Sequence, residues 1–101
     1  MKYRITVSEK ANALIKRHIA FIANVSKSAA RKQLKEFETS LKKLEDQPER
    51  YPFFEAPYIP ADKYHKLIID SRYLFLYIIK DNEVSIEYVL DCRQDYSWLI
   101  K

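Results

Sequence analysis

The sequence predicts a single α+β domain over residues 1–101, in which an antiparallel helical hairpin packs on a mostly antiparallel four-stranded sheet. Three observations predict this fold. A segment of alternating polar and apolar residues opens the chain, and two amphipathic segments with helical spacing follow it. Three strand-like segments then stand close together in the final third, before a short C-terminal tail or helix.

The first strand and the first helix follow from residue spacing. Polar and apolar side chains alternate from Lys2 to Val7, which is typical of a strand with one buried face. Ser8 is a candidate N-cap. The residues after it predict a helix to about Ala23, because apolar or half-apolar side chains recur at helical spacing: Ala11, Leu14, Ile15, His18, Ile19 and Ile22.

The second helix begins after a break at residues 24–26, with Ser26 or Ser28 as the capping residue. Its apolar stripe follows steps of four, three, four and three residues: Ala30, Leu34, Phe37, Leu41 and Leu44. Because only a few residues join the two helices, we expect them to lie antiparallel.

The segment from Pro48 to Ala61 is expected to lack regular structure, because it contains four prolines. Aromatic residues stand between these prolines, so we expect an ordered loop that its aromatic side chains hold in place.

Three strands are predicted after the loop, at Tyr64–Ile69, Tyr73–Ile79 and Val84–Leu90. The middle one is almost wholly apolar and should be a central strand covered on both faces. In the last strand, alternation places Val84, Ile86, Tyr88 and Leu90 on one face. Glu87 and Asp91 then belong to the other face, which we expect to be open and to carry the site. A short C-terminal tail or helix is expected at Gln94–Ile100.

Composition excludes several classes of function. The chain has no glycine, so it has no glycine-rich loop for a nucleotide phosphate, and its turns depend on Asn, Asp, Ser and Pro. His18, His65 and Cys92 lie far apart and lack the paired spacing of a metal site, so we expect no metal and no cofactor. We interpret His18 as a core-edge residue and Cys92 as a small buried one. A single cysteine cannot form an internal disulfide, which suits a cytoplasmic protein without a membrane span.

Positive charge is concentrated in the first half of the chain. Residues 1–47 carry eleven Lys/Arg and five Asp/Glu, a net charge of +6, whereas residues 48–101 carry seven and nine, a net charge of −2. Lys27, Arg31 and Lys35 follow one another at steps of four on the second helix. Such a surface attracts polyanions or an acidic partner protein. A solvated helix face is the alternative, and for so modest an excess of charge it is the favoured interpretation.

Several motifs resemble those of the RelE/ParE superfamily of bacterial toxins. They are the stretch 64–70, the aromatic strand 73–77, and the final strand running into a tail at 91–96. Leu44, Pro48 and the pair Tyr51-Pro52 also stand where the family has a leucine and two prolines. The likeness covers nearly the whole chain, and it rests on the order and spacing of motifs that are individually loose.

The resemblance implies the toxin of a type II toxin–antitoxin pair, held inactive by a cognate antitoxin. ParE-like members bind DNA gyrase, whereas RelE-like members are metal-independent endoribonucleases that cut mRNA on the ribosome. Operator DNA would be bound only through the antitoxin complex, and the resemblance leaves a homodimer open. A third reading is an inactive relative that binds only its antitoxin or, in a repressor complex, operator DNA.

The resemblance also implies three catalytic residues for the ribonuclease reading. Arg93 falls where the family has a tail arginine, Tyr96 is a candidate acid, and His65 is a candidate base or acid. A structural ion pair with a neighbouring aspartate is the alternative role of Arg93. Arginines of RelE-like members are replaced here by His65, Leu74 and Gln94. This loss of positive charge favours the ParE-like reading, in which the basic hairpin binds a protein.

Overall fold

The computed structural model describes residues 2–57 and 59–92. Four strands and two helices follow in the predicted order: β1 (Arg4–Val7), α1 (Glu9–Ala23), α2 (Lys27–Lys42), β2 (His65–Ile69), β3 (Tyr73–Lys80) and β4 (Glu83–Asp91). Two short 3₁₀ helices, η1 (Lys43–Glu45) and η2 (Pro48–Arg50), lie between α2 and β2. The predicted C-terminal tail or helix at Gln94–Ile100 lies outside the described residues.

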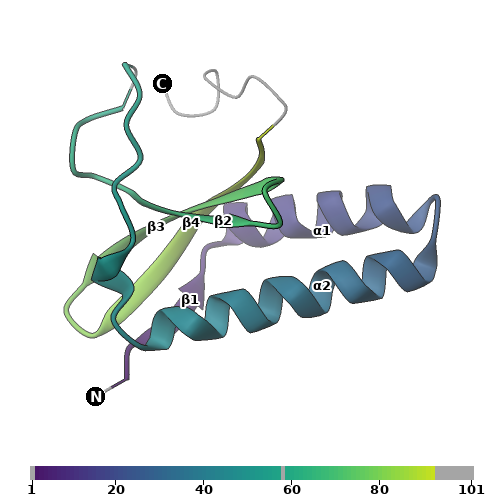
Figure 1. Ribbon diagram of the computed structural model, residues 1–101, viewed down its shortest axis with the longest axis horizontal. Helices are drawn as coiled ribbons and strands as arrows, with labels where there is room; N and C mark the ends of the chain where they lie inside the picture. The colour runs from purple at the N-terminus through teal and green to yellow at the C-terminus, as the bar shows by residue number, and fades with distance from the viewer. Residues whose placement is uncertain (1, 58, 93–101) are drawn as a thin grey trace.

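The four strands form one sheet in the order β1-β4-β3-β2 (Figure 1). Both pairings that involve β3 are antiparallel, and β1 lies parallel to β4 with Arg4 opposite Glu83. The first and last strands of the chain are therefore neighbours. The α+β architecture and the mostly antiparallel sheet are confirmed, and β3 is an interior strand as predicted. None of the described helices is long and apolar enough to span a membrane.

Serine side chains begin both helices. The Ser8 hydroxyl oxygen accepts a hydrogen bond from the Ala11 amide at 3.0 Å, and the Ser26 hydroxyl oxygen accepts one from the Ala29 amide at 3.1 Å. Of the two candidate caps for α2, Ser26 is thus the one that satisfies a free amide of the first turn. The helices lie side by side and antiparallel, as Figure 1 shows.

The helical hairpin covers one face of the sheet and builds the main core. Phe37 of α2 is 1% exposed, and its ring packs edge-on against Tyr73 at 4.9 Å and Phe75 at 5.1 Å. The predicted stripe of α2 continues through η1, where Leu44 is fully buried. Alternate residues of the strands complete this core: Leu67, Ile69, Tyr73, Phe75, Tyr77, Val84, Ile86 and Val89.

A β-bulge at Glu87 changes which residues of β4 face the helices. Leu76 pairs with Tyr88, but Tyr77 pairs with Ile86, so Glu87 has no partner on β3. One extra residue in a strand reverses the alternation beyond it. The prediction that Val84, Ile86, Tyr88 and Leu90 share one face is therefore wrong: the first two face the helices, and the last two join the opposite cluster.

The opposite face of the sheet is covered as well, which corrects the expectation of an open face. Phe54 and Ile59 of the proline-rich loop pack there, together with Tyr64 just before β2. They cover strand residues Leu74, Leu76, Tyr88 and Leu90. Because β3 is apolar on both faces, the second face also needs a cover. Asp91, expected on the open face, is buried and lies opposite Tyr73 on the helix side.

The proline-rich loop is ordered, and hydrogen bonds attach it to the sheet. The Phe54 amide donates to the Tyr64 carbonyl at 2.6 Å, and the Lys66 amide donates to the Pro52 carbonyl at 2.9 Å. The loop thereby occupies the start of the outer edge of β2. The 3₁₀ helix η2 at Pro48–Arg50 corrects the prediction that the segment from Pro48 to Ala61 lacks regular structure.

Turns without glycine use residues in the left-handed region. Asp62, Asp70, Ser71 and Asp81 have φ between 55° and 60°, as expected for a chain that must turn on Asp and Ser. Gln47, with φ of 52°, was not predicted. It lies between η1 and η2, immediately before Pro48.

Candidate functional site

His65, a predicted catalytic residue, lies on the first position of β2 and is only 8% exposed. Its ring is stacked on Tyr77 at 5.3 Å and packs against Phe53 at 4.2 Å. The Nδ1 atom lies 2.7 Å from the Tyr51 carbonyl oxygen. A carbonyl oxygen only accepts, so Nδ1 carries the proton and donates.

These contacts give His65 a structural role. The imidazole links β2 to the proline-rich loop, together with the hydroxyl of Tyr77, which donates to the Pro48 carbonyl at 2.6 Å. Burial raises the pKa of that tyrosine hydroxyl, so it remains a donor at physiological pH. A ring held between two aromatic side chains has little freedom to meet an RNA ribose.

The other two predicted catalytic residues, Arg93 and Tyr96, lie outside the described residues, and their roles stay predictions. The described chain reaches Asp91 and Cys92 beside Tyr73 and Arg72. His65 lies at the other end of β2, about 13 Å away along a five-residue strand. The structure therefore does not bring His65 to the end of β4.

Two basic residues, Arg72 and His18, contact the Tyr73 ring at that end of the sheet. The Arg72 guanidinium lies 5.1 Å from the Tyr73 ring, and its buried Nε has no hydrogen-bond partner among the described residues. His18 of α1 packs edge-on against the same ring at 5.2 Å. Arg72 was missed by the sequence reasoning, because its position beside a turn carries no signal of its own.

His18 occupies the core-edge position that its spacing predicts. Its Nε2 donates to the Val89 carbonyl at 3.3 Å, which requires a proton on that nitrogen. Burial lowers the pKa of His18, and the positive charges of Arg17 and Arg72 lower it further, against the opposing effects of Val89 and Asp91. His18 is therefore neutral at neutral pH and links α1 to β4.

We expect this lowered pKa to make the protein less stable in mild acid. The unfolded chain binds a proton at His18 more readily than the folded one, so stability is lost as the pH falls through about 6.5. Urea unfolding at about pH 7.5 and about pH 5.5 measures this loss. His18→Gln keeps a donor for Val89 and should show a smaller loss. Equal losses in both proteins would contradict the assignment.

Cys92 is exposed and not buried as predicted, because it follows the last residue of β4. Its amide donates to the Arg72 carbonyl at 2.7 Å, which ties the end of β4 to the turn before β3. Partial desolvation and the neighbouring Asp91 raise the pKa of the Cys92 thiol, the opposite of nucleophile activation. Among the described residues, no group of three His, Cys, Asp or Glu side chains is placed to hold a metal ion.

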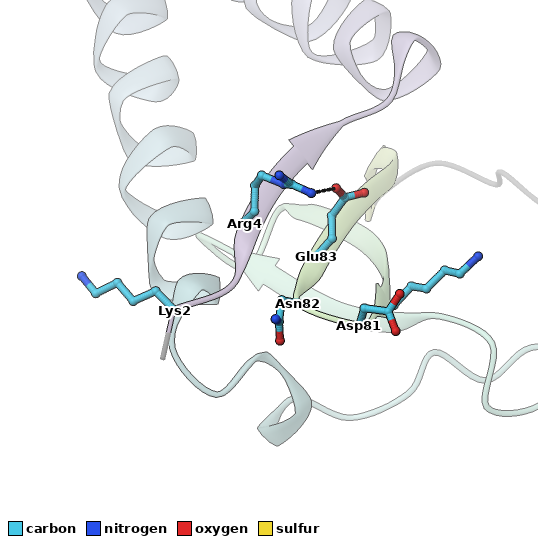
Figure 2. Close-up of a pocket in the computed structure, with 6 residues that line it drawn as sticks. Lys2, Arg4, Asp81, Asn82 and Glu83 are labelled. Atoms are coloured by element: carbon cyan, nitrogen blue, oxygen red, sulfur yellow. Dashed lines mark hydrogen bonds and ion pairs between the residues drawn. The ribbon is translucent and has the colours of Figure 1, made fainter.

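An open hollow of about 460 Å³ lies where β1 begins beside the turn between β3 and β4. Figure 2 shows Arg4 paired there with Glu83, at 3.1 Å, while Lys2 points away from the pair. Lys2 itself lies 3.9 Å from Glu45. The residues that line this hollow carry both signs of charge, so a charged ligand would meet no uniform electrostatic potential there.

A second hollow, of about 370 Å³, lies between α2 and the end of β2. Glu36 and Asp70 meet in it, and a hydrogen bond between their carboxyl groups raises the pKa of Glu36. Gln33 also donates to Asp70 at 3.3 Å. Acidic and basic side chains line this hollow too. Such a mixture is more typical of a contact between the helices and the sheet than of a ligand site.

The outer surface of the helical hairpin has one sign of charge over a long stretch. Residues 10–35 contain seven Lys/Arg and no Asp/Glu. Lys10 is partly engaged, because its Nζ lies 2.8 Å from the Tyr88 hydroxyl oxygen, which raises the pKa of Lys10. Lys27, Arg31 and Lys35 of α2 are exposed to solvent, as their spacing predicted. This surface can bind an acidic macromolecule.

Comparisons with known proteins agree with this fold. Residues 5–96 match the family model described as ParE toxin of type II toxin-antitoxin system, parDE. A solved structure titled "Chromosomal ParDE TA system from P. aeruginosa" is similar, with a TM-score of 0.72 and 12% sequence identity. The alignment covers 89% of this chain and 96% of that one, and at this identity it shows a shared fold. No curated protein matches the chain in sequence.

Proposed function

This chain belongs to the ParE toxin family of type II toxin–antitoxin systems, and from that premise we propose that it acts by binding DNA gyrase. A cognate antitoxin neutralises it. The choice of target rests on the contacts of His65, whose ring is stacked on Tyr77 and donates a hydrogen bond to the Tyr51 carbonyl. A protein-binding toxin needs no proton-transfer group, and the basic hairpin supplies a surface for an acidic protein.

The alternative is a ribosome-dependent mRNA endonuclease that uses Arg93 and Tyr96. One observation favours it: the charges of Arg17, Arg72 and Asp91 all act on the pKa of His18, and Asp91 ends β4 two residues before Arg93 in sequence. Cations at such a place could stabilise the extra charge on a phosphate during cleavage. The buried carboxylate of Asp91 opposes this, because its negative charge acts at the same place.

Parallel assays with the purified toxin separate the two functions. We expect the toxin to abolish supercoiling by DNA gyrase, while mRNA on translating ribosomes stays intact. Defined cuts in mRNA without loss of supercoiling would overturn the proposal. In that case Arg93→Ala should abolish cleavage, because it removes the cation opposite the reacting phosphate. An Arg93→Ala protein that is folded and still cuts would overturn the catalytic assignment of Arg93 too.

A further inference from the structure

The apolar stripe of α1 continues past the sheet that it packs on. Leu14 contacts both core clusters, and His18 bonds to Val89 of β4. Phe21 continues this side of the helix, and Val25 follows in the connection to α2. Figure 1 shows the two helices extending beyond the end of the sheet at this place. Phe21 is 67% exposed and Val25 is 87% exposed.

Positively charged residues follow these two apolar residues closely in sequence. Lys27 and Arg31, which begin α2, are exposed and lie in the stretch of residues 10–35 that has no acidic residue. Neither Lys27 nor Arg31 forms an ion pair with another described residue. The cations near the connection are therefore not neutralised by carboxylates within the described part of the chain.

We infer that this hairpin tip, formed by Phe21, Val25, Lys27 and Arg31, is the surface with which the toxin docks on its target protein. The complementary surface is an apolar recess with an acidic rim. This inference rests on the proposed function, since the target is taken to be DNA gyrase. Exposed apolar patches that are bordered by polar or charged residues are typical of protein interaction sites. Aromatic side chains at the centre of such sites become buried when the partner binds.

The composition of the tip favours a protein partner over a nucleic acid. Phosphate groups are bound by cations and polar groups, which Lys27 and Arg31 would provide without help from apolar neighbours. Val25 has no ring on which a base could stack. Burying Phe21 and Val25 together requires an apolar surface of matching shape, which proteins offer.

Binding of four toxin proteins to purified DNA gyrase tests the inference. They are the wild type, the double variant Phe21→Ser/Val25→Ser, the charge reversal Lys27→Glu/Arg31→Glu, and the matched reversal Lys42→Glu/Lys43→Glu. The last pair lies at the opposite end of α2 and is also exposed, so it changes the net charge equally at a distance from the tip.

We expect the apolar double variant to weaken binding by at least about thirtyfold, as loss of a central aromatic contact does. Reversal at the tip should weaken it by about tenfold or more, and reversal at the far end by less than about threefold. Thermal unfolding checks that each variant is folded. The substituted residues are exposed, so the melting temperatures should stay close to that of the wild type.

Failure of the inference is distinct from failure of the proposed function. If the wild type does not bind gyrase, the proposed function is wrong and the docking assignment falls with it. If the wild type binds and the tip variants bind equally well, only the docking assignment is wrong. If the wild type binds a short DNA duplex and only Lys27→Glu/Arg31→Glu abolishes that binding, the tip is a nucleic-acid site and the inference is wrong. If the wild type is a dimer and Phe21→Ser/Val25→Ser dissociates it, the tip is a self-association surface and the inference is also wrong.

Discussion

Deletion of Val89 should destabilise the protein far more than deletion of Glu87. Glu87 is the unpaired residue of the bulge, so its removal leaves Ile86 opposite Tyr77 and Tyr88 opposite Leu76, and every other residue of β4 keeps its face. Val89 is buried and paired with Phe75. A shift of one residue moves later side chains to the other face of the sheet, so without Val89 the buried Asp91 would enter the apolar cluster opposite, or Glu87 would enter it in place of Tyr88.

The expected loss for the Val89 deletion is about 5 kcal/mol or more, comparable with the whole stability of a small domain. Circular dichroism and urea unfolding of both deletion variants measure it. The Glu87 deletion is the matched control, since it shortens the strand equally, keeps the pairing and removes a bond accepted from Ser85. That variant should lose about 2 kcal/mol at most. Equal urea midpoints for the two deletion variants would show that Glu87 is not the extra residue of β4.

Phe37→Ala should be the most damaging single substitution in the helical hairpin. The Phe37 side chain is buried between α2 and the sheet, and it contacts the rings of Tyr73 and Phe75. Removing it loses the transfer free energy of the ring and leaves a cavity that the flanking rings cannot fill. Such substitutions cost about 3–5 kcal/mol.

Leu34→Ala is the control for that prediction, because Leu34 lies one turn earlier on α2 and is 38% exposed. Its loss should be about 1 kcal/mol or less. Urea unfolding of both variants gives the comparison, with the slope of the transition checked for two-state behaviour. Equal losses for Phe37→Ala and Leu34→Ala would mean that the hairpin is not packed on the sheet through Phe37.

Local chemistry explains why much of the fold could be predicted from the sequence. Ser8 and Ser26 cap their helices through bonds to residues three positions later, a range that sequence reasoning handles well. The spacing of the apolar residues in α2 predicted that Phe37 and Leu44 are buried, and both are. The apolar run of β3 likewise predicted an interior strand.

Features set by long-range contacts could not be predicted in the same way. The residues around Glu87 alternate smoothly, so nothing in the sequence marks an extra residue, and the bulge becomes visible only against β3. The cover of the second face comes from Phe54 and Ile59, which are distant in sequence from Leu90. The expectation of an open face carrying Asp91 failed for these two reasons.

The candidate site was predicted only in part, for a related reason. A histidine in a strand does not reveal which face it joins or what covers it. The contacts of His65 with Phe53 and Tyr51 exist because the loop returns across the edge of β2. Phe21 stood on the same helical side as Leu14, and this spacing was a usable signal. Its exposure depends on where the sheet ends, which spacing alone does not give.

The parallel pairing of β1 with β4 also sets the order in which the sheet can assemble during synthesis. Arg4 meets Glu83 across 79 positions of chain, so β1 stays unpaired until β4 has been synthesised. Contacts of such high sequence separation form slowly. The folded sheet therefore cannot be completed on the ribosome before β4 has left it.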